Sequence, residues 1–229
     1  MKMKALLIDI DGTLLDFRQA EIRGISAVLE HYGIAPDGEK TKRYHDLNQR
    51  FWQKYERGEI TRREIGILRY PAYFEELGLD GKVDPAVCER LYEGAVEGLL
   101  IVIDGAEEML RYLSSRYLLY AASNGYSRMQ RDRLERAGLL PYFRDLFISE
   151  DTGSQKPQKE YFDYCFARMP QDIRRDEVMI IGDGLSSDMA GGNRAGIHTC
   201  WYNAYGETNE AGVSIDVEIH SLEEISKIL

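Results

Sequence analysis

The sequence predicts an α/β protein: a doubly wound parallel sheet with an inserted all-helical domain. Short apolar runs without alternation, typical of strands buried on both faces, recur along the chain with helical patterns between them. By contrast, the stretch from residue 17 to about residue 97 carries helical patterns only. We therefore expect a core made of residues 1–16 and 98–229, and a helical cap domain made of residues 17–97.

Five runs of the core are expected to be strands: residues 5–8, 118–122, 146–149, 178–181 and 198–202. Strands that alternate with helices form parallel sheets, and such sheets bind ligands at the carboxyl ends of their strands. Two helices between and after these strands carry capping-box spacings. The expected boxes are Asp104 with Glu107, and Ser221 with Glu224 before a final helix over residues 222–228.

The cap domain is expected to hold four helices. The first has an apolar face at helical spacing, formed by Ile22, Ile25, Leu29 and Tyr32. Thr61 and Glu64 begin a third helix, which Pro71 should kink or end because proline lacks the N–H of an interior helical bond. Asp84 followed by Pro85 begins the fourth.

Composition excludes several classes of partner. The 229 residues include 29 Lys and Arg against 39 Asp and Glu, so a net charge of −10 disfavours nucleic-acid polymers and anionic membranes. Three well-separated cysteines without metal-binding spacing indicate free thiols in a reducing compartment. No apolar run is long enough for a membrane span or a signal peptide, so we expect a cytoplasmic protein, either monomer or homodimer.

The first expected strand ends in a group of carboxylates, Asp9-Ile10-Asp11-Gly12-Thr13-Leu14-Leu15-Asp16. Charge at the end of a buried strand is costly unless it is paired or bound to a metal. Taken alone, two aspartates followed by glycine also fit an ordinary tight turn.

Three more polar groups follow later strands: Ser123-Asn124-Gly125, Ser154-Gln155-Lys156-Pro157 and Gly182-Asp183-Gly184-Leu185-Ser186-Ser187-Asp188. By itself, the first fits an ordinary turn with a helix cap, the second a solvated surface lysine, and the third an acidic helix cap. Together they should meet at one edge of the sheet, where carboxylates and a lysine suit magnesium and a phosphate group. A carboxylate beside such a cation can attack phosphorus and form an aspartyl-phosphate.

With these four motifs in this order, the chain resembles the haloacid dehalogenase superfamily, specifically its phosphatases with a helical cap. The resemblance covers nearly the whole chain and implies a Rossmann-like core. It implies that Asp9 is the nucleophile and that Asp11 protonates the leaving group and then activates water. It further implies that Mg²⁺, with Mn²⁺ as a substitute, is held by Asp9, the backbone carbonyl of Asp11 and Asp183.

By the same resemblance, Ser123, the backbone after it at Asn124, and Lys156 bind the phosphoryl oxygens, and Lys156 belongs to the catalytic set. Asp188 is expected to orient Lys156 or a metal-bound water, with direct metal binding as the alternative. Gly184 departs from the pattern, because many members carry serine there. That departure puts only a hydrogen bond near the metal in doubt.

Residues 51–61 and 73–78 are similar to the branch of pyrimidine 5′-nucleotidases, some of which clear noncanonical nucleotides. A nucleoside monophosphate is therefore the expected substrate, with Phe17, Trp52, Tyr55 or Tyr70 stacking on the base, Phe17 foremost. The alternative for these rings is a purely structural core. Other functions left open are a sugar-phosphate phosphatase, a phosphomutase of the same fold, and a non-catalytic binding module. Asp11 weighs against a dehalogenase or a phosphonatase.

Overall fold

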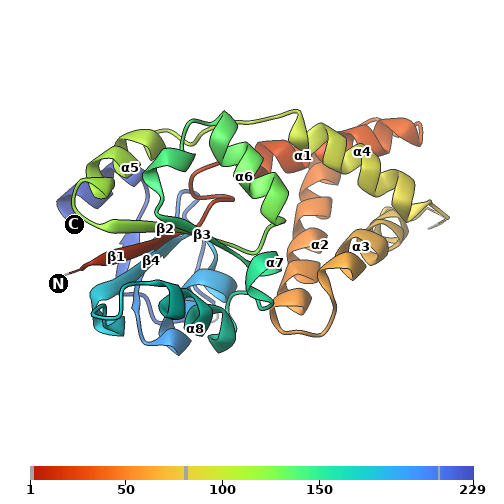
Figure 1. Ribbon diagram of the computed structural model, residues 1–229. Helices are drawn as coiled ribbons and strands as arrows, with labels where there is room; N and C mark the ends of the chain where they lie inside the picture. The colour runs from red at the N-terminus through yellow and green to blue at the C-terminus, as the bar shows by residue number, and fades with distance from the viewer. Residues whose placement is uncertain (1–2, 80–81, 211) are drawn as a thin grey trace. The chain divides into compact units, whose positions relative to one another are not determined.

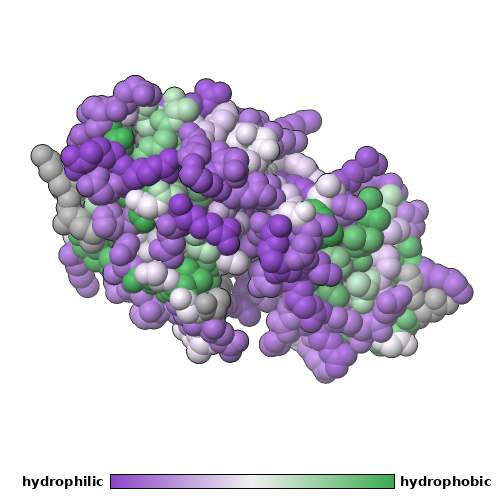
Figure 2. Space-filling model, turned by 90° about the horizontal axis from the view of Figure 1, so that it is seen from below, coloured by the Kyte–Doolittle hydropathy of each residue, from purple (hydrophilic) through white to green (hydrophobic). Residues whose placement is uncertain are grey.

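A computed structural model describes residues 3–79, 82–210 and 212–229. The chain forms two compact units. The first, called here the α/β unit, comprises Met1–Asp16 and Ile101–Leu229, and the second, the helical unit, comprises Phe17–Leu100. Hydrophilic side chains dominate the face shown in Figure 2. Within the described residues, no helix combines the length and apolarity needed to cross a bilayer.

The α/β unit contains a sheet whose described strands are all parallel (Figure 1). The strands are β1 (Ala5–Ile8), β2 (Leu118–Ser123), β3 (Asp145–Ile148), β4 (Val178–Gly182), β5 (His198–Tyr202) and β6 (Val217–Ile219). Their order across the sheet is β3-β2-β1-β4-β5-β6. This topology confirms the predicted fold class. The three-residue strand β6 was not predicted, because so short a run carries no periodicity.

Helices cover both faces of this sheet, with α5 and α6 on one face and α8 on the other (Figure 1). The helices are α5 (Ala106–Ser114), α6 (Ser127–Arg136), α7 (Ser149–Thr152), α8 (Lys159–Arg168) and α9 (Ala190–Ala195), with short turns η1 (Leu140–Tyr142), η2 (Arg175–Glu177), η3 (Leu185–Met189) and η4 (Leu222–Lys227). On the α8 face, Ala5 and Leu7 share a buried cluster with Phe162 and Cys165. Because both faces are covered, β1 is apolar at every position.

The register of β1 decides where polar groups meet. Ile8, its last residue, pairs with Ala121 of β2 and with Ile181 of β4. The segments that follow these three strands therefore leave the sheet side by side, at one edge.

The helical unit consists of α1 (Phe17–His31), α2 (Gly38–Glu56), α3 (Arg62–Glu76) and α4 (Pro85–Glu97) among the described residues. The predicted starts of α3 and α4 are confirmed. Thr61 and Glu64 form a capping box, and Asp84 caps a helix whose first residue is Pro85. The core of this unit is rich in aromatic residues: Tyr44, Phe51, Tyr55, Tyr70, Tyr73, Phe74 and Tyr92.

Two features of the helical unit differ from prediction. Pro71 does not end helix α3, which continues to Glu76. The missing bond leaves the carbonyl of Ile67 on a side of the helix that solvent reaches, since Ile67 is 45% exposed. On α1, Ile22 is exposed and Glu21 is buried. The carboxylate of Glu21 takes the inner position because Asn48 donates a hydrogen bond to it.

Two helix ends in the α/β unit also differ from prediction. Asp104 does not cap α5; the capping position is Gly105, whose φ of 81° needs a residue without a side chain. The Ser221–Glu224 capping box is present, but it starts the 3₁₀ turn η4, which ends at Lys227. Short C-terminal segments commonly adopt this tighter winding.

Candidate active site

Lys156 is the centre of a buried charged cluster in the α/β unit. It precedes α8, and its Nζ lies 2.6 Å from Oδ1 of Asp9 and 2.6 Å from Oδ1 of Asp188. A third bond, of 2.7 Å, goes to the carbonyl of Ala122 in β2. The three donors of the ammonium are thus satisfied, which offsets the cost of burying this side chain at 2% exposure.

The cluster shifts the ionisation of its members. Burial opposes a charge on Lys156, but the carboxylates of Asp188 and Asp9 outweigh it and raise the pKa of the ammonium. Burial raises the pKa of Asp9 to about 7, an effect that Lys156 opposes and Asp188 strengthens. Burial among protein atoms and the charges of Asp9 and Asp188 raise the pKa of Asp183. The side chain of Asp183 also reaches solvent, which weakens the first of these causes.

The donor set fits a divalent cation. Carboxylate oxygens of Asp9, Asp183 and Asp188 lie within 4.8 Å of one another. Asp188 is already committed, since Oδ1 accepts from Lys156 and Oδ2 accepts from the N–H of Gly184. Three carboxylates against one ammonium leave an excess of two negative charges when all are ionised. A magnesium ion held by Asp9 and Asp183 would offset that excess.

Gly12 and Thr13 hold Asp183 in place. Gly12 has a φ of 87°, and a Cβ at this position would overlap the carboxylate of Asp183. The hydroxyl of Thr13 accepts a 3.1 Å hydrogen bond from the N–H of Asp183. The motif after β1 therefore gives the motif after β4 both room and an anchor.

At Gly184, where many members of the superfamily carry serine, the side chain of Ser187 occupies the space beside the backbone. A Cβ on Gly184 would overlap Oγ of Ser187, so the Ser187 hydroxyl fills the space of the absent side chain. The N–H of Gly184 donates to Asp188 at 3.1 Å. Gly184 thus contributes its backbone N–H to Asp188 and has no side-chain group to offer near the metal.

Ser123 and Asn124 differ in what they can offer a ligand. The hydroxyl of Ser123 accepts from the N–H of Gly125 at 2.9 Å and from Nε2 of Gln130 at 2.8 Å. These bonds use its acceptor lone pairs and leave its hydrogen to donate. The side chain of Asn124 instead bonds both the N–H and the carbonyl of Lys156. The side chain of Asn124 is thus used to hold the loop that carries Lys156.

Asp11, the second carboxylate of the first motif, is paired with α6. Its two oxygens accept hydrogen bonds from Gln130 and Arg133, both buried. We did not predict these partners from the sequence. A signal was present, because Gln130, Arg133, Leu134 and Ala137 follow the spacing of an inward helical face. Polar side chains on an inward helical face need buried hydrogen-bond partners, so such a pattern predicts that partners exist.

A family profile described as haloacid dehalogenase-like hydrolase matches residues 3–196. The chain belongs to the haloacid dehalogenase-like hydrolases. This confirms the predicted superfamily and the enzyme class, a hydrolase of the phosphatase kind. Among its relatives is the HAD-hydrolase YfnB of Bacillus subtilis, 39% identical over 100% of this chain and 96% of YfnB.

Two further relatives of this hydrolase are pyrimidine 5′-nucleotidases. PynA of Streptococcus pneumoniae is 32% identical, covering 98% of this chain and 94% of PynA. YjjG of Escherichia coli is 30% identical, covering 100% of this chain and 99% of YjjG. A crystal structure of YfnB bound to magnesium matches with a TM-score of 0.90 and 38% identity, covering 100% of this chain and 99% of that one. The YfnB crystal shows that a relative of this hydrolase binds magnesium.

The aromatic residues singled out in the sequence belong to the helical unit of the hydrolase. Phe17 begins α1 and is half-buried. Trp52 is also half-buried; its ring stands edge-on to Tyr55 at 5.8 Å, and the guanidinium of Arg62 lies 5.4 Å from its centroid. Tyr70 is fully buried. Phe17 and Trp52 are thus partly exposed residues, whereas Tyr70 is not exposed.

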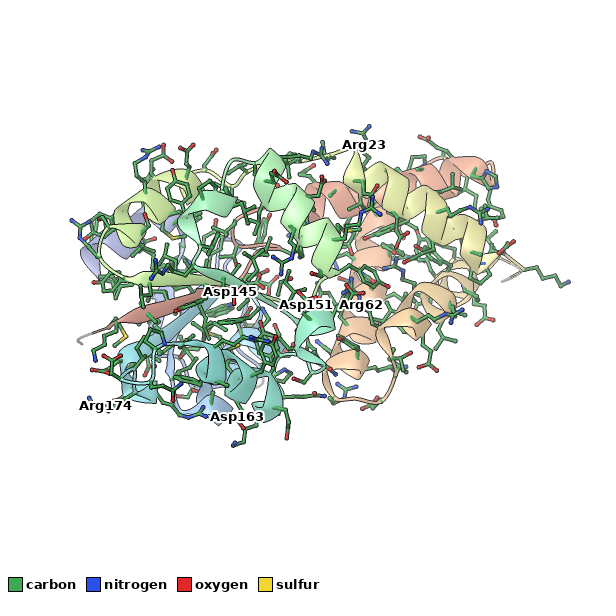
Figure 3. The ribbon with its side chains drawn as sticks, viewed as in Figure 1. Arg23, Arg62, Asp145, Asp151, Asp163 and Arg174 are labelled. Atoms are coloured by element: carbon green, nitrogen blue, oxygen red, sulfur yellow. The ribbon has the colours of Figure 1, made fainter. Side chains whose placement is uncertain are left out.

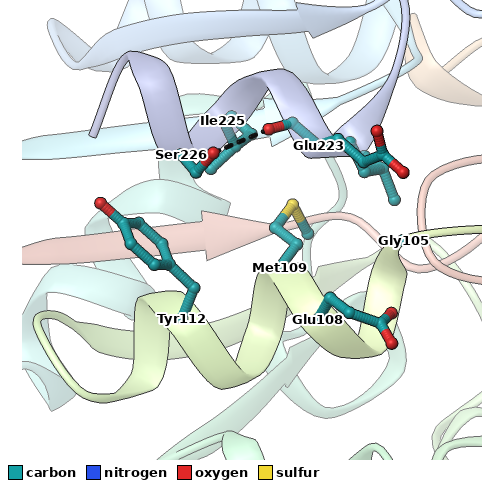
Figure 4. Close-up of a pocket in the computed structure, with 8 residues that line it drawn as sticks. Gly105, Glu108, Met109, Tyr112, Glu223, Ile225 and Ser226 are labelled. Carbon is teal, nitrogen blue, oxygen red and sulfur yellow. Dashed lines mark hydrogen bonds between the residues drawn. The ribbon is translucent and has the colours of Figure 1, made fainter.

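A separate hollow of about 250 Å³ lies between α5 and η4 in the α/β unit (Figure 4). Its lining is mainly apolar, with Met109 and Tyr112 on one side and Ile225 on the other. Two glutamates at its rim, Glu108 and Glu223, are its only described acidic residues. Its described lining includes no basic residue that would offset the charge of a phosphate.

Proposed function

We propose that this hydrolase is a magnesium-dependent phosphomonoester phosphatase that acts on pyrimidine nucleoside 5′-monophosphates. The observation that carries the proposal is the meeting of Asp9, Lys156, Asp183 and Asp188 in one cluster of the α/β unit. The choice of substrate is supported by PynA and YjjG, which match over nearly their full lengths.

In the proposed reaction, the free oxygen of Asp9 attacks phosphorus as the bond to the ester oxygen breaks. Asp11 gives its proton to that departing oxygen, and an aspartyl-phosphate remains on Asp9. Asp11 then takes a proton from the water that attacks the same phosphorus. The Asp9–phosphorus bond breaks, inorganic phosphate leaves, and both carboxylates return to their starting states.

Charge stabilisation during these steps comes from two side chains. The hydroxyl hydrogen of Ser123 is available to a phosphoryl oxygen. The ammonium of Lys156, held by Asp188, stabilises negative charge beside Asp9. Magnesium, held by Asp9, the carbonyl of Asp11 and Asp183, would supply the positive charge that offsets repulsion between phosphate and carboxylates.

The test is a panel of phosphate monoesters assayed with Mg²⁺ by released inorganic phosphate. We expect UMP, dUMP and dTMP to have higher kcat/KM than purine nucleotides and than glucose or glycerol phosphates. A preference for sugar phosphates would contradict the nucleotidase assignment and leave the phosphatase chemistry intact. Isomerised sugar phosphate with little free phosphate would instead indicate a phosphomutase.

A further inference from the structure

Helix α6 presents two buried polar side chains that have no part in the four sequence motifs. Gln130 is 1% exposed and Arg133 is 3% exposed. A spacing of three residues places them on the same helical face. Burial of an amide and a guanidinium is costly unless their bonds are made, so their partners are informative.

Those partners form a closed ring of hydrogen bonds around Asp11. Nε2 of Gln130 donates to Oδ2 of Asp11, and Nη1 of Arg133 donates to Oδ1. Nη1 of Arg133 also donates to Oε1 of Gln130 at 3.1 Å, which sets the direction of the amide. Both oxygens of Asp11 are therefore held, and rotation of its carboxylate would break a bond.

Gln130 links this ring to the phosphate-binding residue Ser123. The second hydrogen of its Nε2 goes to Oγ of Ser123 at 2.8 Å, so one amide group holds both residues. Gly125 makes room for it, because a Cβ on Gly125 would overlap Nε2 of Gln130. Gly125 and Gln130 together thus place the carboxylate of Asp11 and the hydroxyl of Ser123.

We propose that Gln130 and Arg133 are positioning residues that orient Asp11 for proton transfer. Gln130 also fixes the position of the Ser123 hydroxyl relative to the Asp11 carboxylate. This inference rests on the proposed function, in which Asp11 is the acid and base. Neither residue touches the reacting atoms; Arg133 acts through Asp11, and Gln130 acts through Asp11 and Ser123. Their loss should slow the steps that need a correctly placed Asp11, which are protonation of a poor leaving group and activation of water.

The test compares Arg133→Met and Gln130→Met with the matched control Arg136→Met. Arg136 lies on the same helix but is exposed and pairs with Asp132. For UMP we expect kcat to fall about a hundredfold in the first two variants, as for a misplaced catalytic group, with KM changed little. Nitrophenyl phosphate should still give a rapid burst of nitrophenol, because this leaving group needs little protonation. Arg136→Met should match the wild type.

A double-variant experiment separates positioning from a structural role. In an Asp11→Asn background, Arg133→Met should cause no further loss, since its effect passes through the missing carboxylate. A full additional loss there would overturn the inference, as would wild-type kcat in both single variants. Should Arg133→Met fail to fold, Arg133→Lys serves in the same cycle, because it keeps the charge and loses the planar fork. Full activity of Asp11→Asn itself would instead refute the proposed function.

Discussion

The ammonium of Lys156 and the carboxylate of Asp188 lie 2.6 Å apart, and only 2% of each side chain is exposed. Without Asp188, one buried donor of the ammonium loses its acceptor, and Asp9 is left as the charged partner of Lys156. We expect Asp188→Ala to lower the free energy of unfolding by about 3 kcal/mol and to reduce turnover strongly. Urea unfolding and phosphate release measure the two effects.

The control for that variant is Asp163→Ala. Asp163 pairs with Lys159 and Arg175 on the outside of α8, and its side chain is 41% exposed (Figure 3). An exposed pair should contribute at most about 1 kcal/mol. Equal unfolding curves for Asp188→Ala and the wild type would mean that Asp188 does not stabilise the Lys156 charge.

The second prediction concerns the metal. Phosphate release should stop in excess chelator and return when Mg²⁺ or Mn²⁺ is added, because the cluster of Asp9, Asp183 and Asp188 repels a phosphate dianion. Calcium should not restore it, since calcium prefers more ligands and longer bonds. Undiminished turnover in chelator would refute the metal assignment.

The third prediction separates the roles of Asp9 and Asp11. Asp9→Asn should abolish the covalent intermediate and reduce turnover by several orders of magnitude. Asp11→Asn should reduce turnover of UMP by about a hundred- to ten-thousandfold, the usual range for lost proton transfer. With nitrophenyl phosphate, rapid mixing should reveal a burst in the second variant alone. Identical burst kinetics in the two variants would show that the roles are wrongly assigned.

The fourth prediction concerns Phe17 in the helical unit. Stacking on a base contributes about 1–3 kcal/mol, so Phe17→Ala should lower kcat/KM for UMP about ten- to a hundredfold. Hydrolysis of nitrophenyl phosphate should stay within a few fold of the wild type. The matched control is Phe166→Ala, a half-buried phenylalanine of the α/β unit. It should affect both substrates equally. An equal loss for both substrates in Phe17→Ala would show that this ring is structural.

The fifth prediction is a pH dependence of stability in the helical unit. Nδ1 of His45 lies 2.6 Å from Oε2 of Glu21, and this hydrogen bond raises the pKa of His45 above 6.5, against the effect of burial. A folded-state pKa above the unfolded one stabilises the fold fully below pH 6.5. That contribution is lost as pH rises through the raised pKa.

We therefore expect the wild type to lose about 1 kcal/mol more than His45→Gln between slightly acidic and alkaline pH. The chain has two tryptophans, so a Trp201→Phe background lets the fluorescence of Trp52 report urea unfolding of the helical unit. His31→Gln, an exposed site on α1, is the control. The same pH dependence in His45→Gln and the wild type would contradict the prediction.

The sequence by itself determined strands β1 to β5 and the polar motifs that follow the first four of them. A strand covered on both faces is apolar throughout, so β1 and β4 are visible in the sequence as uninterrupted apolar runs. Parallel strands bring their carboxyl ends to one edge of the sheet, so the order of runs and motifs is enough to predict that Asp9 and Asp183 lie together. Caps are equally local, and Thr61 and Asp84 mark the starts of α3 and α4 by their own hydrogen bonds.

Only the tertiary structure decided which polar side chains are buried and what they bind. Arg133 meets Asp11 across 122 residues of sequence, and Glu21 meets Asn48 across 27. No local pattern encodes such a pair. The spacing of residues in a helix shows which face is buried, but it does not show which side chain of another element contacts that face. For the same reason the apolar spacing of α1 predicts an inward Ile22, where the folded chain buries Glu21 instead. Whether a polar residue can be buried depends on a distant partner that satisfies its hydrogen bonds, and only the folded chain supplies that partner.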